Sequence, residues 1–489
     1  MRRKSGSPVK ITHVNCTCKK GFVAEEDSNL VVLNAMPSKI LLISVNRCAT
    51  PYPVFPLGLA HVAAALVRAG HRVEIADCAV NPDDVEAAIK SMSPDYIGLS
   101  LRNIDDLQIQ DPHFFAGELS VLSKKIRSLS KAPIIIGGSG FALFPQRLLA
   151  ESGADFGIKG EAEEAVVQLI AALENKTPYK QIPGLVHRDN SRVVQNDQQP
   201  GAVKNIVPPM HPSGLVRFYI DKSSMLNIQT QRGCAYTCCY CTYPVIEGTA
   251  VRFKPPTAIG DELEQIKKSG AKYFFIVDSV FNSSPGHVTG VCEEMLLRNL
   301  NLSWGCFLRP QGLTQKLMDL MARAGLSHIE FGSDSFSDSV LAEYGKFFNF
   351  EDVFRSSEYA RIAKIHYAHF LIIGGPGETE NTLRESFENS KRLTKTVHFP
   401  FVGMRVYPAT QLYERALGER VITKDTDLLP PFFYISPHLT KERIFNLLGS
   451  FSQESRNWIV GELPHENAKV AKSLRAMGVA GPLWEFLVR

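Results

Sequence analysis

Three closely spaced cysteines, Cys234, Cys238 and Cys241, constrain this chain more than any other feature of its sequence. Their spacing, C-x3-C-x2-C, supplies three thiolates to a four-iron cluster, which has room for four protein ligands. One iron therefore keeps an open coordination site, where a small molecule can chelate the metal. The motif predicts a site for chemistry as well as for electron transfer.

Two other kinds of metal site are built from cysteines, a structural zinc site and a plain electron-transfer cluster, and both usually need a fourth ligand. Cys292 and Cys306 lie about fifty or more residues downstream, in segments expected to form a helix and a strand. Neither is paired with a nearby histidine in a zinc-like pattern. We expect Cys239, between the second and third ligands, to be a bystander.

The motif, with the aromatic Tyr240 directly before its last cysteine, resembles the radical S-adenosylmethionine (SAM) superfamily. In that superfamily the free iron binds the amino and carboxylate groups of SAM, and reductive cleavage of SAM releases a 5′-deoxyadenosyl radical. The resemblance implies a 4Fe-4S cluster on the three cysteines, SAM as a cofactor close to Tyr240, and a flavodoxin or ferredoxin as electron donor.

The chain of 489 residues is long enough for two or three domains. Its 10 cysteines, without an export signal, indicate thiols kept reduced in the cytoplasm, and no segment reads as a membrane span. The net charge of +4 is spread along the chain, which gives little support for a nucleic-acid partner. Residues 1–36 are expected to form a flexible leader, in which Cys16 and Cys18 are plain thiols.

Residues 37–182 alternate β-branched runs with helical stretches, the pattern of a doubly wound, Rossmann-like α/β domain with a parallel sheet. The clearest helix, Leu57 to Arg68, has one apolar face and ends before Gly70. Ligands of such sheets bind beyond the carboxyl ends of the strands. We expect strands at residues 39–45, 72–76, 96–100, 133–137 and 155–158.

A dinucleotide is disfavoured as the ligand of this domain, because no turn has the G-x-G-x-x-G spacing. The domain resembles instead the cobalamin-binding domain that precedes the cluster in one class of radical SAM enzymes. The signature D-x-H-x-x-G is absent, so the resemblance implies a cobalt whose lower face has no protein histidine, and we expect His61 to be packed or solvated. The residues assigned to cobalamin are Pro56, Leu57, Gly58, Arg102, Asn103, Gly137, Gly138, Gly160 and Glu161.

A linker is expected over residues 183–217, a barrel over residues 218–418, and a small, mostly helical region over residues 419–489. Six parallel strands suit the partial (β/α)6 barrel of the superfamily, whose active site lies at the carboxyl ends of the strands. The strand candidates are residues 226–230, 273–277, 302–307, 328–331, 368–373 and 401–406.

Polar residues at these strand ends are assigned to SAM by the resemblance. Asp278 and Ser279 are expected near its amino group, and Arg309 and Glu330 near its carboxylate and ribose. Ser333 is expected to assist them. For Glu330 the open alternative is a salt bridge inside the barrel.

The glycine-rich segment after the fifth strand candidate is a further expected contact. Gly374 and Gly375 are assigned to the adenine of SAM, because glycine lets a ring approach the backbone. An ordinary glycine turn is the alternative. The sequence leaves open whether Arg405 faces SAM, cobalamin or substrate.

The implied cofactors predict transfer of a methyl group to an unactivated carbon of a lipid or natural product, with two SAM consumed for each methyl transferred. Three alternatives stay open. The first is ring closure or rearrangement without methyl transfer. The second is a tRNA methylthiotransferase, which carries a second cluster on three cysteines of its front domain, where this chain has only Cys48 and Cys78. The third is a non-catalytic sensor.

Overall fold

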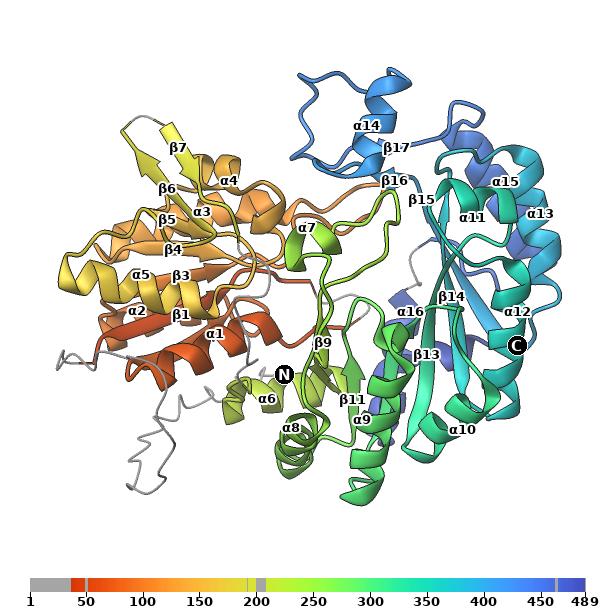
Figure 1. Ribbon diagram of the computed structural model, residues 1–489, viewed down its shortest axis with the longest axis horizontal. Helices are drawn as coiled ribbons and strands as arrows, with labels where there is room; N and C mark the ends of the chain where they lie inside the picture. The colour runs from red at the N-terminus through yellow and green to blue at the C-terminus, as the bar shows by residue number, and fades with distance from the viewer. Residues whose placement is uncertain (1–36, 49–51, 191, 199–207, 462–464, 489) are drawn as a thin grey trace, which may run out of the picture.

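The computed structural model describes residues 37–48, 52–190, 192–198, 208–461 and 465–488. They form two α/β domains that lie side by side, the front domain coloured red to yellow and the barrel green to blue (Figure 1). The fold class predicted from the sequence is confirmed. The expected leader, with Cys16 and Cys18, lies outside the described residues.

The front domain is a seven-stranded sheet in the order β2-β1-β3-β4-β5-β6-β7, and its first five strands are parallel. Alternate side chains of each strand point to opposite faces, and helices bury both faces: α1 and α5 one, α2, α3 and α4 the other. The elements are β1 (Lys39–Ser44), α1 (Leu57–Arg68), β2 (Arg72–Asp77), α2 (Asp84–Met92), β3 (Tyr96–Ser100), α3 (Phe115–Leu129), β4 (Ile134–Gly137), α4 (Pro145–Ser152), β5 (Phe156–Ile158) and α5 (Glu163–Asn175).

An antiparallel hairpin, β6 (Leu185–Asp189) and β7 (Arg192–Gln195), extends this sheet at its edge. The segment expected to be a linker, residues 183–217, therefore begins as part of the front sheet. Val186 is fully buried and Val193 packs against the same core. These two inward-facing valines anchor the hairpin to the front domain, although the segment as a whole is polar.

The barrel has six parallel strands in the order β15-β14-β13-β12-β11-β8. Its helices lie on the outside of the curved sheet (Figure 1). The elements are β8 (Leu226–Ile228), α8 (Pro256–Lys268), β11 (Tyr273–Ile276), α9 (Pro285–Leu297), β12 (Ser303–Leu308), α10 (Gln315–Arg323), β13 (Leu326–Asp334), α11 (Asp338–Glu343), α12 (Phe350–Ile362), β14 (His366–Ile373), α13 (Glu380–Ser390) and β15 (Thr396–Val402).

The sixth barrel strand lies earlier than residues 401–406, where the sequence had placed it. The parallel strand ends at Val402, and Gly403 then takes a left-handed conformation with φ +79°. That residue turns the chain away from the barrel. Met404–Arg405 forms the short strand β16, which pairs antiparallel with β17 (Phe433–Tyr434). An apolar run across a turning glycine therefore misled the prediction.

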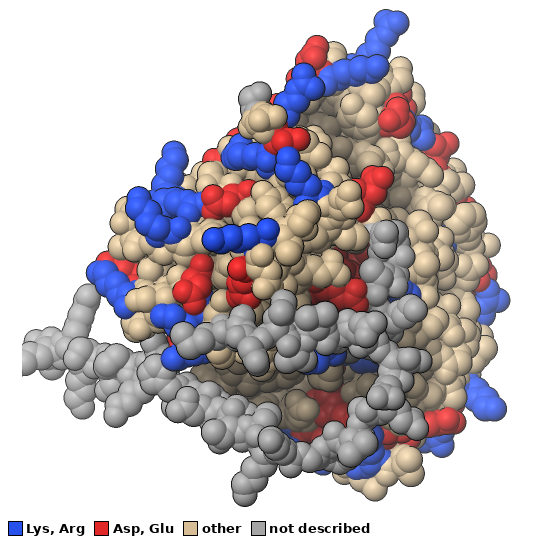
Figure 2. Space-filling view, turned by 60° about the vertical axis from the view of Figure 1, so that its left-hand side comes forward, with Lys and Arg blue, Asp and Glu red and all other residues tan. Residues whose placement is uncertain are grey.

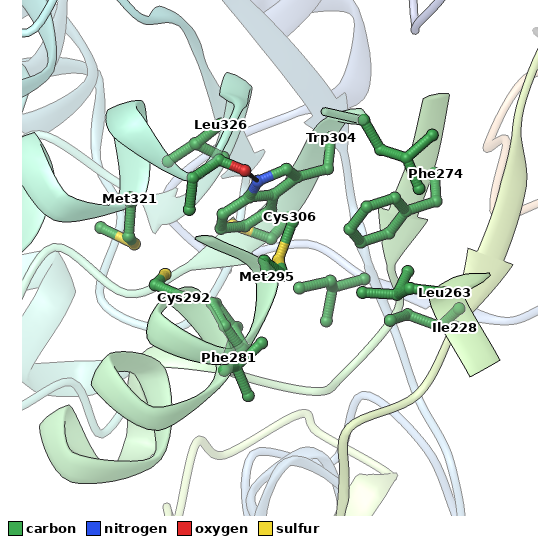
Figure 3. Close-up of a cluster of buried hydrophobic side chains, with 14 of the residues drawn as sticks. Ile228, Leu263, Phe274, Phe281, Cys292, Met295, Trp304, Cys306, Met321 and Leu326 are labelled. Carbon is green, nitrogen blue, oxygen red and sulfur yellow. Dashed lines mark hydrogen bonds between the residues drawn. The ribbon is translucent and has the colours of Figure 1, made fainter. Parts of the chain in front are cut away.

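The core between the outer face of the barrel and its helices is built around Trp304 (Figure 3). Its indole N–H donates to the carbonyl of Ala324 at 2.9 Å, which satisfies the one polar atom of a fully buried ring. Cys292 and Cys306 lie in the same apolar cluster and are fully buried. Both thiols are surrounded by apolar side chains, as expected for core residues.

The C-terminal region packs back onto both ends of the barrel. It contains α14 (Gln411–Gly418), α15 (Lys441–Glu454), α16 (His465–Ala476) and a single 3-10 turn, η3 (Trp484–Leu487). The turn η3 lies against β14 and β15 and buries Trp484 among Ala368 and Val397. The last described residues therefore close one side of the barrel.

The two domains are joined by buried polar contacts. Arg405, between the barrel and the C-terminal region, forms an ion pair of 2.9 Å with Asp105 of the front domain, and their side chains are 4% and 0% exposed. The Arg405 guanidinium also donates to the carbonyl of Leu428 at 2.9 Å. A second contact runs from the Tyr219 hydroxyl to Asp77 Oδ2 at 2.8 Å. Arg405 is thus a domain-joining residue in this structure.

Replacing Asp105 by alanine is expected to lower the free energy of unfolding by about 3 to 5 kcal/mol, because it leaves the Arg405 charge buried and unpaired. Urea unfolding followed by circular dichroism measures the change. The matched control is Asp427→Ala, which breaks an exposed pair with Arg147 and is expected to cost at most about 1 kcal/mol. Equal losses in the two variants would contradict the role given to Asp105.

Candidate active site

The cysteine loop begins where the short strand β9 (Gln231–Arg232) ends, and Gly233 makes the turn possible. Gly233 has φ +86°, and a Cβ at this position would lie 2.1 Å from the carbonyl oxygen of Ala250. The next residue, Cys234, donates its backbone N–H to the carbonyl of Gly248 at 3.1 Å. The loop is therefore fixed by a backbone contact that only glycine permits.

The three thiols of the motif lie close enough to influence one another. Burial raises the pKa of Cys234 and raises that of Cys241 to about 12, and the neighbouring thiols of the motif add to both shifts. A bound iron would displace these protons, since it is the thiolate that binds metal. Within the described residues, no group of three or more His, Cys, Asp or Glu side chains is placed to hold a single metal ion.

Cys239 lies in an apolar cluster with Val340, Tyr344 and Met404. Its backbone N–H donates to the carbonyl of Tyr344 at 3.0 Å, and its own carbonyl accepts from the N–H of Leu412 at 2.8 Å. These contacts attach the cysteine loop to two barrel segments. We keep the prediction that Cys239 is a packing residue.

A buried polar triad, which no sequence motif predicted, lies beside the loop. The Tyr240 hydroxyl donates to Asp334 Oδ2 at 2.5 Å, and Lys346 Nζ lies 2.5 Å from the same oxygen. Burial opposes the charge on Lys346, but Asp334 and Cys238 together raise its pKa. A cation is thus held next to Cys238, inside the buried surroundings of the cysteine loop. Lys346 follows a helix at no recognisable motif, so only the fold could reveal it.

Arg309, directly after β12, is the predicted residue whose surroundings best fit SAM. Its guanidinium stacks on the ring of Tyr236, 3.9 Å from the ring centroid. The pKa of Cys234 is raised by burial, and the nearby Arg309 charge offsets part of that rise. The side chain is buried, yet Nε and Nη2 have no hydrogen-bond partner among the described residues. An unsatisfied buried cation next to the cysteine loop fits the carboxylate of a SAM molecule chelated to the open iron.

Asp278 and Ser279 follow β11 and face the base of the cysteine loop. Asp278 is fully buried and accepts from the backbone N–H groups of Thr230 and Gln231 at 2.7 and 3.2 Å. Burial raises the pKa of Asp278 to about 7. The Ser279 hydroxyl donates to the Gly233 carbonyl at 3.3 Å. Asp278 thus braces the segment that leads into the loop, while Ser279 lies close to Cys234.

The other residues assigned to SAM have partners within the protein. Glu330 points into the barrel and accepts from the indole of Trp484 at 3.2 Å, not from a basic residue as the salt-bridge alternative required. The Ser333 hydroxyl bonds to His369 Nδ1 at 2.8 Å in the core. A Cβ on Gly375 would lie 2.3 Å from the Tyr344 hydroxyl oxygen, so a protein side chain already fills the space beside this glycine. Gly374 donates its N–H to Glu378. Their assignment to SAM stays a prediction.

The carboxyl ends of β1 and β3 form the topological switch point of the front sheet, where such folds bind ligands. Asn46 bridges them: its Nδ2 donates to the carbonyl of Asn103 at 2.9 Å, and its Oδ1 accepts from the N–H of Arg102 at 2.6 Å. Asn46 was not among the residues assigned to cobalamin from the sequence, although it lies two residues after β1 at the ligand-binding end of the sheet. A Cβ on Gly138 would lie 2.5 Å from the carbonyl oxygen of Leu101, so this glycine lets the loop after β4 approach.

The start of α1 offers open space on the same side of the sheet. A Cβ on Gly58 would meet no atom within 4 Å, while Pro56 and Leu57 are buried beside it. This open space beside Gly58, together with the switch point, fits the flat edge of a corrin ring. His61, one turn further along, is fully buried within the fold. At Gly137, the last residue of β4, an added Cβ would make an ordinary contact only.

Gly160 and Glu161, also assigned to cobalamin, meet the barrel. A Cβ on Gly160 would collide with the Gln198 side chain. Glu161 lies 3.3 Å from the Arg232 guanidinium and accepts from Arg252 at 2.8 Å. Glu163 pairs with Arg232 at 2.6 Å. Since Arg232 directly precedes Gly233, the loop after β5 holds the cysteine loop against the front domain.

Comparisons with known proteins agree with this geometry. The B12 binding domain model matches residues 43–170, and the Radical SAM superfamily model matches residues 228–389. The tryptophan 2-C-methyltransferase of Streptomyces laurentii is 23% identical over 78% of this chain and 76% of its own length. An anaerobic magnesium-protoporphyrin IX monomethyl ester cyclase of Cereibacter sphaeroides is 22% identical over 68% of this chain and 55% of its own length.

The solved structure of the radical SAM methyltransferase TsrM from Kitasatospora setae, with cobalamin and a [4Fe-4S] cluster bound, has the same fold. It superposes with a TM-score of 0.81 at 24% identity, over 92% of this chain and 97% of that one. Fold and site thus define a radical SAM protein with a B12-binding domain in front of its barrel. The chain belongs to the cobalamin-dependent radical SAM enzymes, with a 4Fe-4S cluster, SAM and cobalamin as cofactors.

Two surface properties bear on partners. None of the helices in the described part of the chain is long and apolar enough to cross a membrane. On the face shown in Figure 2, basic and acidic side chains are interspersed.

Replacing Cys234, Cys238 or Cys241 by alanine is expected to abolish cluster assembly, because the motif offers no spare ligand. Iron analysis and visible absorbance after anaerobic reconstitution measure this. The matched control is Cys239→Ala, in the same loop, which is expected to keep its iron and to lose roughly 1 kcal/mol of stability from reduced packing. Loss of iron in this control, or zinc as the native metal, would contradict the assignment.

Replacing Arg309 by methionine is expected to weaken SAM binding about tenfold to a hundredfold, the effect of removing a charge-assisted hydrogen bond. Equilibrium dialysis of iron-loaded protein against labelled SAM gives the dissociation constant. The control is Arg392→Met, because Arg392 also stacks on aromatic rings but pairs with exposed Glu351 at the surface. Unchanged SAM affinity in the Arg309 variant, with normal iron content, would refute its role.

Proposed function

We propose that this enzyme transfers a methyl group from SAM to an unactivated carbon of a small, largely apolar substrate. The observation that carries the proposal is the position of the cysteine loop, held against the ligand-binding edge of the front sheet by Glu161 and Glu163. A substrate in the barrel can therefore meet both cofactors. The enzyme would act in the cytoplasm and take its electrons from a flavodoxin or ferredoxin.

When bound, the cluster with SAM supplies a carbon-centred radical, and cobalamin supplies a transferable methyl group. The protein's own residues bind, orient and enclose. Arg309 would hold the SAM carboxylate, and Ser279 would lie at the iron-binding end of that site. Asn46 and Arg102 shape the edge of the front sheet that receives the corrin. The barrel strands and the C-terminal segment would shield the reacting atoms from water, which a reactive radical requires.

The relatives support methyl transfer over the alternatives. Ring closure stays open as an alternative, because one relative is a cyclase. The tryptophan 2-C-methyltransferase matches along most of both chains, whereas the cyclase is matched over about half of its length. A methylthiotransferase would need three clustered thiols in the front domain. The described part of that domain has Cys48 and the buried Cys78, which cannot hold a second cluster.

Incubation of the reconstituted, reduced enzyme with methyl-deuterated SAM and substrate is expected to place the label on a carbon of the product. One 5′-deoxyadenosine and one S-adenosylhomocysteine should form for each methyl transferred. Mass spectrometry of product and coproducts measures both. The Cys234→Ala variant, which cannot assemble the cluster, is the control. A 5′-deoxyadenosine signal with an unlabelled, altered product would replace methyl transfer by ring closure or rearrangement. Absence of 5′-deoxyadenosine and label alike would favour a sensor.

A further inference from the structure

Glu330 projects into the interior of the barrel. It pairs in register with Phe307 of β12 and with Ala368 of β14, so these three side chains point to the same side of the sheet. Its neighbours Ile329 and Phe331 point the other way, into the core under the outer helices. The carboxyl of Glu330 is buried.

The C-terminal segment forms a floor beneath this carboxyl. Trp484 donates its indole N–H to Glu330 Oε1 at 3.2 Å, and Glu485 lies 3.2 Å from His328 Nε2. A Cβ on Gly481 would lie 3.1 Å from both His328 and Tyr273. The segment is therefore packed tightly into the end of the barrel opposite the cysteine loop.

Open space lies above the floor, towards the cysteine loop. At Gly332, the next inward position of β13, a Cβ would meet no atom within 4 Å. Phe307 of β12 is 37% exposed although it faces the barrel interior. On the neighbouring strands β14 and β15, Phe370 stacks on Phe399 with 5.1 Å between the ring centroids. Arg309 directly follows β12, two residues and about 7 Å beyond Phe307, so the expected SAM site lies on the cysteine-loop side of this space.

Among the described residues, Glu330 has no basic partner. Trp484 is its one hydrogen-bond donor there, and no ion pair of that part of the chain includes Glu330. A buried carboxyl without a cation is costly to the fold, which indicates a functional use. Tyr52, from the loop that leads into α1, packs with Tyr273 and Phe275 and lies near enough to Glu330 for its own pKa to be raised by that charge. The front domain thus reaches into the same space.

We infer that Glu330 is a substrate-binding residue and that the substrate presents an aromatic ring system with an N–H donor. The phenylalanine walls match a flat ring, and the free carboxyl oxygen matches one donor on that ring. A hydrocarbon lipid would offer no donor to the second oxygen of this carboxyl, the one that Trp484 does not contact. The inference rests on the proposed function, since it names the substrate class of the same barrel.

The experiment compares indole with benzofuran, which has the same shape but an acceptor oxygen in place of the N–H. Binding to the anaerobic enzyme, loaded with cluster, cobalamin and SAM, is measured by calorimetry. The wild type is expected to bind indole about tenfold more tightly than benzofuran. Glu330→Met should erase this difference by weakening indole alone, and Glu330→Gln, which keeps an acceptor oxygen, should retain part of it. The control Glu442→Met alters an exposed residue of α15 and should behave as wild type.

Equal binding of the two probes by the wild type, or no binding of either, overturns the inference without any variant. A tenfold preference that survives in a folded Glu330→Met protein with normal iron content also overturns it. The measurement needs no turnover, so it is independent of the deuterium-transfer experiment. If the enzyme prefers indole but transfers no methyl group, the binding role of Glu330 is supported and the proposed methyl transfer is refuted. If it transfers a methyl group but shows no preference for indole, only the binding role of Glu330 is refuted.

Discussion

The relation between the two cofactor-binding domains depends on a shared set of buried charges next to the cysteine loop. Arg232 and Arg252 stand opposite each other in the antiparallel pair of β9 and β10 (Arg252–Phe253), an arrangement of like charges that is unfavourable by itself. Glu161 and Glu163 of the front domain neutralise them. Because removing one member would leave the others buried without compensation, the domains are held in one relative position. That position sets how the cluster faces the corrin edge.

The site is assembled from three parts of the chain, each with a different task. The front sheet gives a ligand edge stiffened by Asn46, and the barrel gives the cysteine loop with the unsatisfied Arg309. The C-terminal segment gives the floor on which Glu330 rests. A buried site of this kind can exclude water while remaining lined by polar groups at fixed positions, which suits radical chemistry better than a loop-built cleft.

Sequence reasoning worked best where the pattern is local. The helix from Leu57 to Arg68 has the predicted bounds, because its apolar spacing and its stop signal lie within one short segment. It failed where a few residues change the path of the chain, as at Gly403 and in the hairpin of residues 185–195. For Ser333 and Gly375 the structure shows protein neighbours, and their assignment to SAM stays a prediction, since strand ends and glycines look alike in sequence whether they meet a ligand or a protein neighbour.

The sequence alone determined the donor set of the metal centre and the class of chemistry, because Cys234, Cys238 and Cys241 are placed by covalent spacing along a few residues. It also determined that a parallel sheet precedes a barrel, since hydrophobic periodicity is written along the chain. The tertiary structure decided which charges meet. Arg405 with Asp105, Lys346 with Asp334 and Trp484 with Glu330 are pairs between distant segments, and their energies depend on burial, which no local pattern encodes.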